Sequence, residues 1–479
     1  MRDLVLSQGW INGEWVDAND GKRVEVLNPA TGDVITTVPD MGKVESEAAV
    51  NAAHTAFQEW RKTTAKHRAG LLKRWFDLIV ENADGLAKLL TSEQGKPYKE
   101  AYGEVMYGAS FIEWFAEEAK RMYGDVIPAA NPSNRYMTIK QPVGVVSAIT
   151  PWNFPVAMIT RKVGPALAAG CTVVVKPGED TPLCALAMAS LAEQAGIPKG
   201  VINVVTTSRP AEVGEVLCCH PLVRKVSFTG STPVGKLILR QAADTVKKVS
   251  LELGGNAPFI VFEDADLDKA VQGALISKYR NAGQTCVCTN RLYIHDAIYD
   301  EFVQRYTQAV SELKVGQGLA EGTDIGPLIN QKAIDKVDEL VATAQQQGAQ
   351  LVLGGAVSSV GEHYYQPTIL TNVTEAMDIA HQELFGPVST IFRFDDEEDV
   401  IRRANDTPFG LAAYFYTQNH SRVWRVSEAL EYGIIGINEG IISTEVAPFG
   451  GVKESGSGRE GSKYGIDDYL EIKYLCHGL

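Results

Sequence analysis

Short apolar runs alternate with segments of helical spacing along residues 143–252. Strands are expected at 144–149, 172–176, 201–205, 223–229 and 246–251, and helices at 156–169, 182–195, 211–218 and 233–243. Runs such as Thr172-Val-Val-Val175 are apolar on both faces, as a strand covered by helices on each side must be. The alternation predicts a parallel α/β sheet, whose ligands bind beyond the carboxyl ends of its strands.

The segments before this region have other patterns. Residues 11–40 contain short alternating runs among Gly, Asn, Asp and Pro, which predict small strands and turns. Apolar residues at three- and four-residue steps then predict helices at 44–60, 65–90 and 98–122. Residues 124–141 break the helical pattern and predict a β-hairpin. It is either an ordinary surface hairpin or an arm whose unpaired edge recruits another chain.

A thiol lies in a short polar turn between a helix expected at 265–279 and a strand expected at 291–295. Cys286 is therefore placed where a side chain is both fixed and reachable, although a free cysteine often only packs. A second signal is Glu252, which ends an apolar run just before a Gly-Gly turn, where a lone carboxylate is costly to bury. A thiolate that attacks a carbonyl and a carboxylate that activates water together predict acyl chemistry.

Composition narrows the classes of function. The 479 residues are 45% hydrophobic and 22% charged, which is typical of a soluble globular protein with a large core. The net charge of −14 argues against a nucleic-acid partner. Seven scattered cysteines and no export signal lead us to expect a cytoplasmic protein. No apolar run is long enough for a membrane span and no histidines have metal-ligand spacing, so we expect neither a membrane nor a metal partner.

Two glycine motifs compete for a dinucleotide. The stretch Gly456-Ser-Gly-Arg-Glu-Gly461 matches the dinucleotide fingerprint by letter, but it follows no strand of a βαβ unit, and we interpret it as a turn. The stretch from Gly230 to Leu237 nearly matches the phosphate loop of nucleotide hydrolases, but Leu237 replaces the hydroxyl that holds magnesium. The order of a strand, a tight turn at Gly230 and a helix still favours dinucleotide phosphates at this point.

Six short motifs follow one another along the chain: Pro151-Trp-Asn-Phe-Pro155, Val175-Lys-Pro177, Phe228-Thr-Gly-Ser231, Leu251-Glu-Leu-Gly-Gly255, Gly283-Gln-Thr-Cys286 and Glu383-Leu-Phe-Gly-Pro387. In order and spacing they resemble the aldehyde dehydrogenase superfamily over nearly the whole chain. Two further stretches, from Arg280 to Cys288 and Gly440-Ile-Ile-Ser443, are most similar to its succinate-semialdehyde dehydrogenase branch.

The resemblance implies a Rossmann-type cofactor domain, an α/β catalytic domain and a small β oligomerisation arm. We expect residues 1–122 and 143–252 in the cofactor domain, 253–448 in the catalytic domain, and 123–142 with 466–479 in the arm. Residues 449–465 would return to the cofactor domain. The arm implies a homotetramer or a homodimer.

The resemblance also implies the site residues. Cys286 would be the nucleophile, Asn153 an oxyanion donor together with the Cys286 amide, and Glu252 the base that activates water. The residues expected to bind the cofactor are Thr150, Pro151, Trp152, Lys176, Glu179, Gly230, Ser231, Gly235, Leu253, Glu383 and Phe385. A carboxylate at Glu179 would accept a bond from a free 2′-hydroxyl and repel a 2′-phosphate, so we expect NAD in preference to NADP.

In the succinate-semialdehyde branch, the positions of Arg161, Arg280 and Ser443 hold the substrate carboxylate, although either arginine could instead be a surface charge. The expected reaction is NAD(P)-dependent oxidation of succinate semialdehyde, with glutarate semialdehyde as the alternative substrate. Glu252, a base for water, argues against transfer of the acyl group to coenzyme A. The presence of both the thiol and the base argues against a purely structural role. Cys288 is either a packing residue or a redox partner that forms a disulfide with Cys286.

Overall fold

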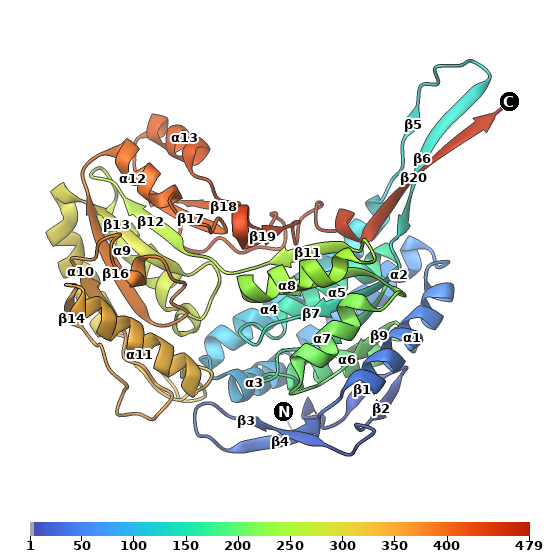
Figure 1. Ribbon diagram of the computed structural model, residues 1–479, viewed down its shortest axis with the longest axis horizontal. Helices are drawn as coiled ribbons and strands as arrows, with labels where there is room; N and C mark the ends of the chain where they lie inside the picture. The colour runs from blue at the N-terminus through green and yellow to red at the C-terminus, as the bar shows by residue number, and fades with distance from the viewer. Residues whose placement is uncertain (1–3) are drawn as a thin grey trace.

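The computed structural model describes residues 4–479, which form two α/β lobes and a narrow projecting β arm (Figure 1). The first lobe contains an eight-stranded sheet in the order β19-β11-β10-β7-β8-β9-β1-β2. Its strands are β1 (Gly9–Ile11), β2 (Glu14–Val16), β7 (Val145–Ile149), β8 (Thr172–Lys176), β9 (Ile202–Val204), β10 (Val223–Thr229), β11 (Lys248–Glu252) and β19 (Gly456–Ser457). Strands β11, β10, β7, β8 and β9 are parallel, which confirms the predicted α/β class.

Helices surround this sheet, and one of them differs from the prediction. They are α1 (Lys43–Trp60), α2 (Ala65–Glu81), α3 (Ala83–Gln94), α4 (Tyr98–Glu118), α5 (Ala157–Ala169), α6 (Leu183–Gln194), α7 (Pro210–Cys219) and α8 (Thr232–Ala243). The single helix expected at 65–90 is wrong, because the chain leaves helical geometry at Asn82 (φ −100°, ψ 11°). The Asn82 side-chain amide donates to the carbonyl oxygen of Leu78 (2.8 Å), a local bond that competes with helical pairing.

The second lobe contains a seven-stranded sheet in the order β14-β15-β16-β13-β12-β17-β18. Its strands are β12 (Ala257–Val261), β13 (Thr289–His295), β14 (Gln350–Leu353), β15 (Thr368–Thr371), β16 (Val388–Phe394), β17 (Ala412–Tyr416) and β18 (Ile434–Ile437). Its helices are α9 (Leu267–Tyr279), α10 (Tyr299–Ser311), α11 (Gln331–Gln346), α12 (Glu397–Asn405) and α13 (His420–Ala429). Only β14 pairs antiparallel with its neighbour in this sheet, so the lobe is again of the α/β type.

The arm is a three-stranded antiparallel sheet in the order β20-β6-β5, and the C-terminal end of the chain runs along it (Figure 1). Its strands are β5 (Val126–Ile127), β6 (Asn134–Pro142) and β20 (Leu470–Gly478). Apolar side chains on the arm remain exposed: 85% of Val126 and 70% of Ile472 are accessible to solvent. A separate hairpin pairs β3 (Arg23–Leu27) with β4 (Val34–Pro39).

Two features of the fold place the polar residues of the site. Parallel strands end at one edge of the first sheet, with β11 ending at Glu252, β10 at Thr229 and β8, on the other side of β7, at Lys176. Helix α5 is buried along its entire length, so Arg161 and Lys162 are held away from solvent. Between positions 4 and 479, no helix is long and apolar enough to cross a membrane.

Candidate active site

The turn that carries Cys286 is fixed by backbone contacts. After α9 ends, Asn281, Ala282 and Gly283 all have left-handed backbone angles, with φ of 53°, 55° and 76°. A Cβ on Gly283 would lie 2.2 Å from the Gly386 carbonyl oxygen, and only glycine fits there without a shift. Such strained conformations persist where the surrounding structure imposes them, often at functional sites. The backbone turn that carries Cys286 is therefore packed closely against the segment of Gly386.

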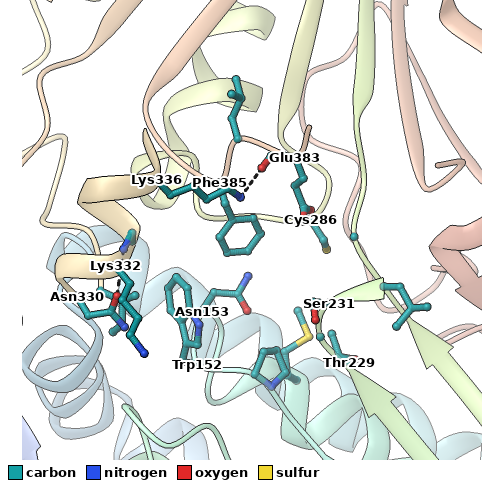
Figure 2. A pocket seen from close by; sticks show the side chains of 18 residues that line it. Trp152, Asn153, Thr229, Ser231, Cys286, Asn330, Lys332, Lys336, Glu383 and Phe385 are labelled. Carbon is teal, nitrogen blue, oxygen red and sulfur yellow. Dashed lines mark hydrogen bonds between the residues drawn. The ribbon is translucent and has the colours of Figure 1, made fainter. Parts of the chain in front are cut away.

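Cys286 lines two cavities. The first, of about 350 Å³, is also lined by Pro151, Trp152, Asn153, Gly230, Ser231, Leu253, Glu383 and Phe385, all predicted site residues. In Figure 2, the Trp152 and Phe385 rings lie next to the Asn153 side chain, and their centroids are 5.7 Å apart in an edge-to-face arrangement. Burial raises the pKa of the Cys286 thiol to about 12, against a smaller lowering by Arg161.

The first cavity has the chemistry that a nicotinamide dinucleotide requires. The carboxylate of Glu383 accepts a hydrogen bond from the Gly255 amide (2.9 Å), and burial raises the pKa of Glu383 to about 7. The Thr229 hydroxyl is buried and has no hydrogen-bond partner among residues 4–479. An aromatic pair, a carboxylate and an unsatisfied hydroxyl fit the flat ring and the ribose hydroxyls of the nucleotide.

The phosphate end of this site is formed by the start of α8. Ser231 is the residue before the helix, whose first amides are available to an anion. Gly235 lets the helix approach Leu253, because a Cβ on Gly235 would lie 2.5 Å from that side chain. Three predicted residues do not line the cavity: Thr150, Lys176 and Glu179. They lie at or just after the adjoining strand ends, where the Thr150 amide donates to the Lys176 carbonyl oxygen (3.0 Å).

Asn153 is held against the Cys286 turn. Its side-chain nitrogen donates to the Gln284 carbonyl oxygen (2.9 Å), which leaves its second N–H for a ligand. The backbone carbonyl oxygen of Asn153 accepts hydrogen bonds from Lys96 Nζ (2.7 Å) and from Asn281 Nδ2 (3.1 Å). These bonds hold the Asn153 amide beside the cavity that the thiol lines.

A buried ion pair that sequence reasoning missed supports this turn. Lys96 Nζ lies 2.6 Å from Glu104 Oε2, and both side chains are almost completely buried. The other carboxylate oxygen of Glu104 accepts from the Val156 amide (3.0 Å) and, more weakly, from Ala157 (3.3 Å). The pair thus ties the Asn153 backbone to the start of α5. A carboxylate on the apolar face of the helix predicted at 98–122 was the available signal, because such a group needs a partner.

Glu252 is a buried carboxylate without a hydrogen-bond partner. It is 2% exposed, and neither of its oxygens is bonded within the described chain. Burial raises its pKa well above the usual value, Glu460 raises it further, and Arg161 and Lys162 lower it. It lines neither of the cavities at Cys286, although it is close enough to raise the pKa of the thiol. An unpaired buried carboxylate is rare in proteins and typical of a functional group.

The second cavity, of about 280 Å³, brings Arg161, Arg280 and Ser443 together with Cys286. Arg161 is fully buried in α5, and its Nε binds the carboxylate of Glu460. Its Nη2 has no partner among the residues described. One guanidinium nitrogen is therefore fixed by the protein while another remains available to an anion in the cavity.

Glu460 is the other residue that sequence reasoning missed. It lies in the stretch interpreted as a turn, and it binds both Arg161 and Lys162. Burial alone would raise its pKa, but the two cations lower it below the usual value. The turn also contains β19, which pairs with β11 beside Glu252. No pattern within this stretch indicates that its carboxylate reaches residues almost 300 positions earlier.

Cys288 is buried, and its sulfur contacts the carbonyl oxygens of Lys278 (3.5 Å) and Thr289 (3.6 Å). The seven cysteines form no disulfide within the chain from 4 to 479. A redox partnership with Cys286 stays a prediction, and it would require Cys288 to leave these contacts. In the same described part, no three His, Cys, Asp or Glu side chains are grouped so that they could hold a metal ion.

Comparison with known proteins identifies the family. A sequence profile described as the Aldehyde dehydrogenase family matches residues 15–475. The chain belongs to the aldehyde dehydrogenase family. It is 61% identical over 477 residues to the succinate-semialdehyde dehydrogenase GabD of Escherichia coli K12, covering 100% of this chain and 99% of that protein. It is 60% identical to the glutarate-semialdehyde dehydrogenase of Pseudomonas putida KT2440, with coverage of 99% and 98%.

Solved structures of this family share the fold. The crystal structure of an Escherichia coli NADP-dependent enzyme matches with a TM-score of 0.99 and 60% identity, over 100% of this chain and 99% of that one. The predictions of an aldehyde dehydrogenase fold and of an enzyme of this family are therefore confirmed.

The prediction of NAD in preference to NADP is wrong. The GabD relative at 61% identity is named for NADP(+), and the matching crystal structure is of an NADP-dependent enzyme. The physical reason lies at Glu179, whose carboxylate is paired with the ammonium group of Lys176. Lys176 offsets its charge, and solvent reaches 37% of the Glu179 side chain, so the repulsion between this carboxylate and a phosphate is weakened.

The raised pKa of Cys286 predicts the pH dependence of its alkylation. The thiolate is the nucleophile, and below its pKa the thiolate fraction grows about tenfold per pH unit. In the absence of cofactor, the rate of Cys286 alkylation by iodoacetamide should rise steadily from pH 7 to pH 10, as followed by peptide mass spectrometry. A rate that levels off near pH 8 would contradict the raised pKa of Cys286. The Cys286→Ser protein is the control for labelling at other thiols.

Proposed function

We propose that this protein oxidises succinate semialdehyde to succinate with NAD(P) as the electron acceptor. The observation that supports this most strongly is the position of one thiol at two cavities. One cavity has the aromatic and polar groups that suit a nicotinamide, and the other has two arginines. The name of the GabD relative, which specifies succinate semialdehyde and NADP(+), supports the same reaction.

The proposed chemistry begins with Cys286. Its thiolate attacks the aldehyde carbon, and the oxyanion that develops accepts hydrogen bonds from the second N–H of Asn153 and from the Cys286 amide. A bound nicotinamide dinucleotide would accept the hydride that the adduct must lose to become an acyl group on Cys286, and it would supply a positive charge near the thiol. Glu252 then takes a proton from water, which releases the acyl group from Cys286 as a carboxylate. The raised pKa of Glu252 suits a group that must accept a proton near neutral pH.

The residues that would hold the cofactor follow from their positions. The Gly230-Ser231 turn and the first amides of α8 would hold the phosphates, with Gly235 and Leu253 setting the position of the helix. Lys176 and Glu179 would hold the adenosine ribose, and Glu383 and Phe385 would hold the nicotinamide half. Thr150, Pro151 and Trp152 would also contact the cofactor, with the Trp152 ring beside that of Phe385.

The second substrate candidate is glutarate semialdehyde, because a relative of 60% identity bears that name. The two substrates differ by one methylene, which a pocket discriminates by only about 1 to 3 kcal/mol. Comparison of kcat/KM for the four- and five-carbon semialdehydes with the same cofactor decides between them.

The carboxylate site is tested with Arg280→Ala. If Arg280 binds the substrate carboxylate, KM for succinate semialdehyde should rise at least tenfold, since a hydrogen bond to a charged group is worth about 1.5 to 3 kcal/mol. KM for butanal, which lacks the carboxylate, should change much less. Equal effects on the two aldehydes would remove the proposed carboxylate site.

We also propose that the protein is a homodimer or homotetramer that assembles through the arm, in a reducing compartment such as the cytoplasm. The support is the exposed apolar surface of the arm, at Val126, Ile472 and Tyr474 among others, and seven cysteines without a disulfide in residues 4–479. An isolated three-stranded ribbon with such a surface is stabilised by pairing with another chain.

Light scattering after gel filtration tests the assembly. The wild-type mass should be two or four times 52.0 kDa. Ile472→Asp should lower it, because the charge would be buried at the interface. Trp424→Asp, a change at a side chain that is 61% exposed outside the arm, is the control and should leave the mass unchanged. A monomeric wild-type protein would contradict the proposal.

A further inference from the structure

Tyr107 has a buried hydroxyl group without a partner. The residue lies in α4, and its hydroxyl accepts or donates no hydrogen bond within residues 4–479. A buried hydroxyl is normally satisfied, so an orphan that faces a cavity indicates a partner outside the chain. The ring itself is well packed, edge to face against Phe111 with centroids 4.9 Å apart.

The surroundings of this hydroxyl indicate the kind of ligand. Tyr107 lines the second cavity together with Arg161, Arg280, Ser443 and Cys286. Burial raises the pKa of Tyr107, although both arginines lower it, so the group remains a hydrogen-bond donor at neutral pH. Its neighbour Arg161 also has an unpartnered donor, Nη2. Two unsatisfied donors in one cavity suit an acceptor that carries a negative charge and more than one oxygen atom.

We propose that Tyr107 is a specificity-determining residue whose hydroxyl donates a hydrogen bond to the carboxylate of the semialdehyde substrate, next to Nη2 of Arg161. The assignment rests on the proposed function, because it presupposes that a carboxylate occupies the second cavity. It adds a neutral donor to the two guanidinium groups. Burying the carboxylate against Tyr107 satisfies the hydroxyl, whereas an uncharged aldehyde of the same length leaves it unsatisfied.

The test is the ratio of kcat/KM for succinate semialdehyde to kcat/KM for butanal. Tyr107→Phe keeps the ring against Phe111 and removes only the hydroxyl, so this ratio should fall about 10- to 100-fold, as expected for loss of a hydrogen bond to a charged group. Tyr299→Phe is the matched control: Tyr299 is also a buried tyrosine, it begins α10 in the other lobe, and it lines neither cavity. Its ratio should equal that of the wild type.

Arg280→Ala separates failure of this inference from failure of the proposed function. If the ratio falls in Arg280→Ala and is unchanged in Tyr107→Phe, the carboxylate site stands and the role of Tyr107 is overturned. If the wild-type protein itself does not prefer succinate semialdehyde to butanal, the proposed function is overturned.

Direct binding provides a second measurement that does not depend on turnover. In a Cys286→Ala background, the Kd of succinate, measured by calorimetry, should rise about tenfold or more when Tyr107→Phe is added. The thermal unfolding midpoints of the two proteins show whether the protein that also carries Tyr107→Phe is folded. Equal Kd values for succinate in two folded proteins would overturn the proposal.

Discussion

Close contact between backbone segments around Cys286 is the constraint on which the site depends. Gly283 approaches the Gly386 carbonyl oxygen, and Gly255, two residues beyond Leu253, approaches the Cys286 carbonyl oxygen so closely that a Cβ would lie 2.4 Å away. Each approach requires a residue without a side chain. These contacts join the turn that carries the thiol, the turn after the end of β11 and the loop of Glu383 and Phe385. The geometry of both cavities follows from this packing.

The buried charged groups of the site differ in whether they have a partner. Lys96 is paired with Glu104, and Glu460 is paired with Arg161 and Lys162, so the charges of these five buried groups are offset by partners. Glu252 differs from these groups, because both of its oxygens lack a hydrogen-bond partner in the described chain. A paired carboxylate is a poor base because its charged form is stabilised, whereas a desolvated one has a raised pKa. The paired groups therefore maintain the structure, and the unpaired carboxylate has the raised pKa that suits the proton transfer proposed for it.

Much of this arrangement is predictable from the sequence because it is local. The alternation of apolar runs predicts the parallel strands, and the motifs that end them contain Lys176, Thr229 and Glu252. What the sequence does not reveal is long-range pairing. Glu460 lies in a glycine-rich stretch with no feature that indicates a buried ion pair with α5. The aromatic spacing of α4 indicates core packing, which hides the polar function of a side chain such as Tyr107.

Two other predictions are wrong for local reasons. The helix break at Asn82 leaves the apolar spacing intact on both sides, so periodicity predicts one helix where there are two. At Glu179, the predicted repulsion of a 2′-phosphate depends on the negative charge of the carboxylate, and Lys176, three residues earlier, offsets that charge. In both cases a single side chain forms a bond that changes the outcome.

The central claim is that Cys286 carries an acyl group that Glu252 releases by activating water. It is tested most directly by the intact mass of Glu252→Gln protein after mixing with succinate semialdehyde and NADP. The account predicts a protein heavier by one succinyl group, attached to Cys286 and absent in the Cys286→Ser control. Steady turnover at the wild-type rate without such an adduct would contradict it.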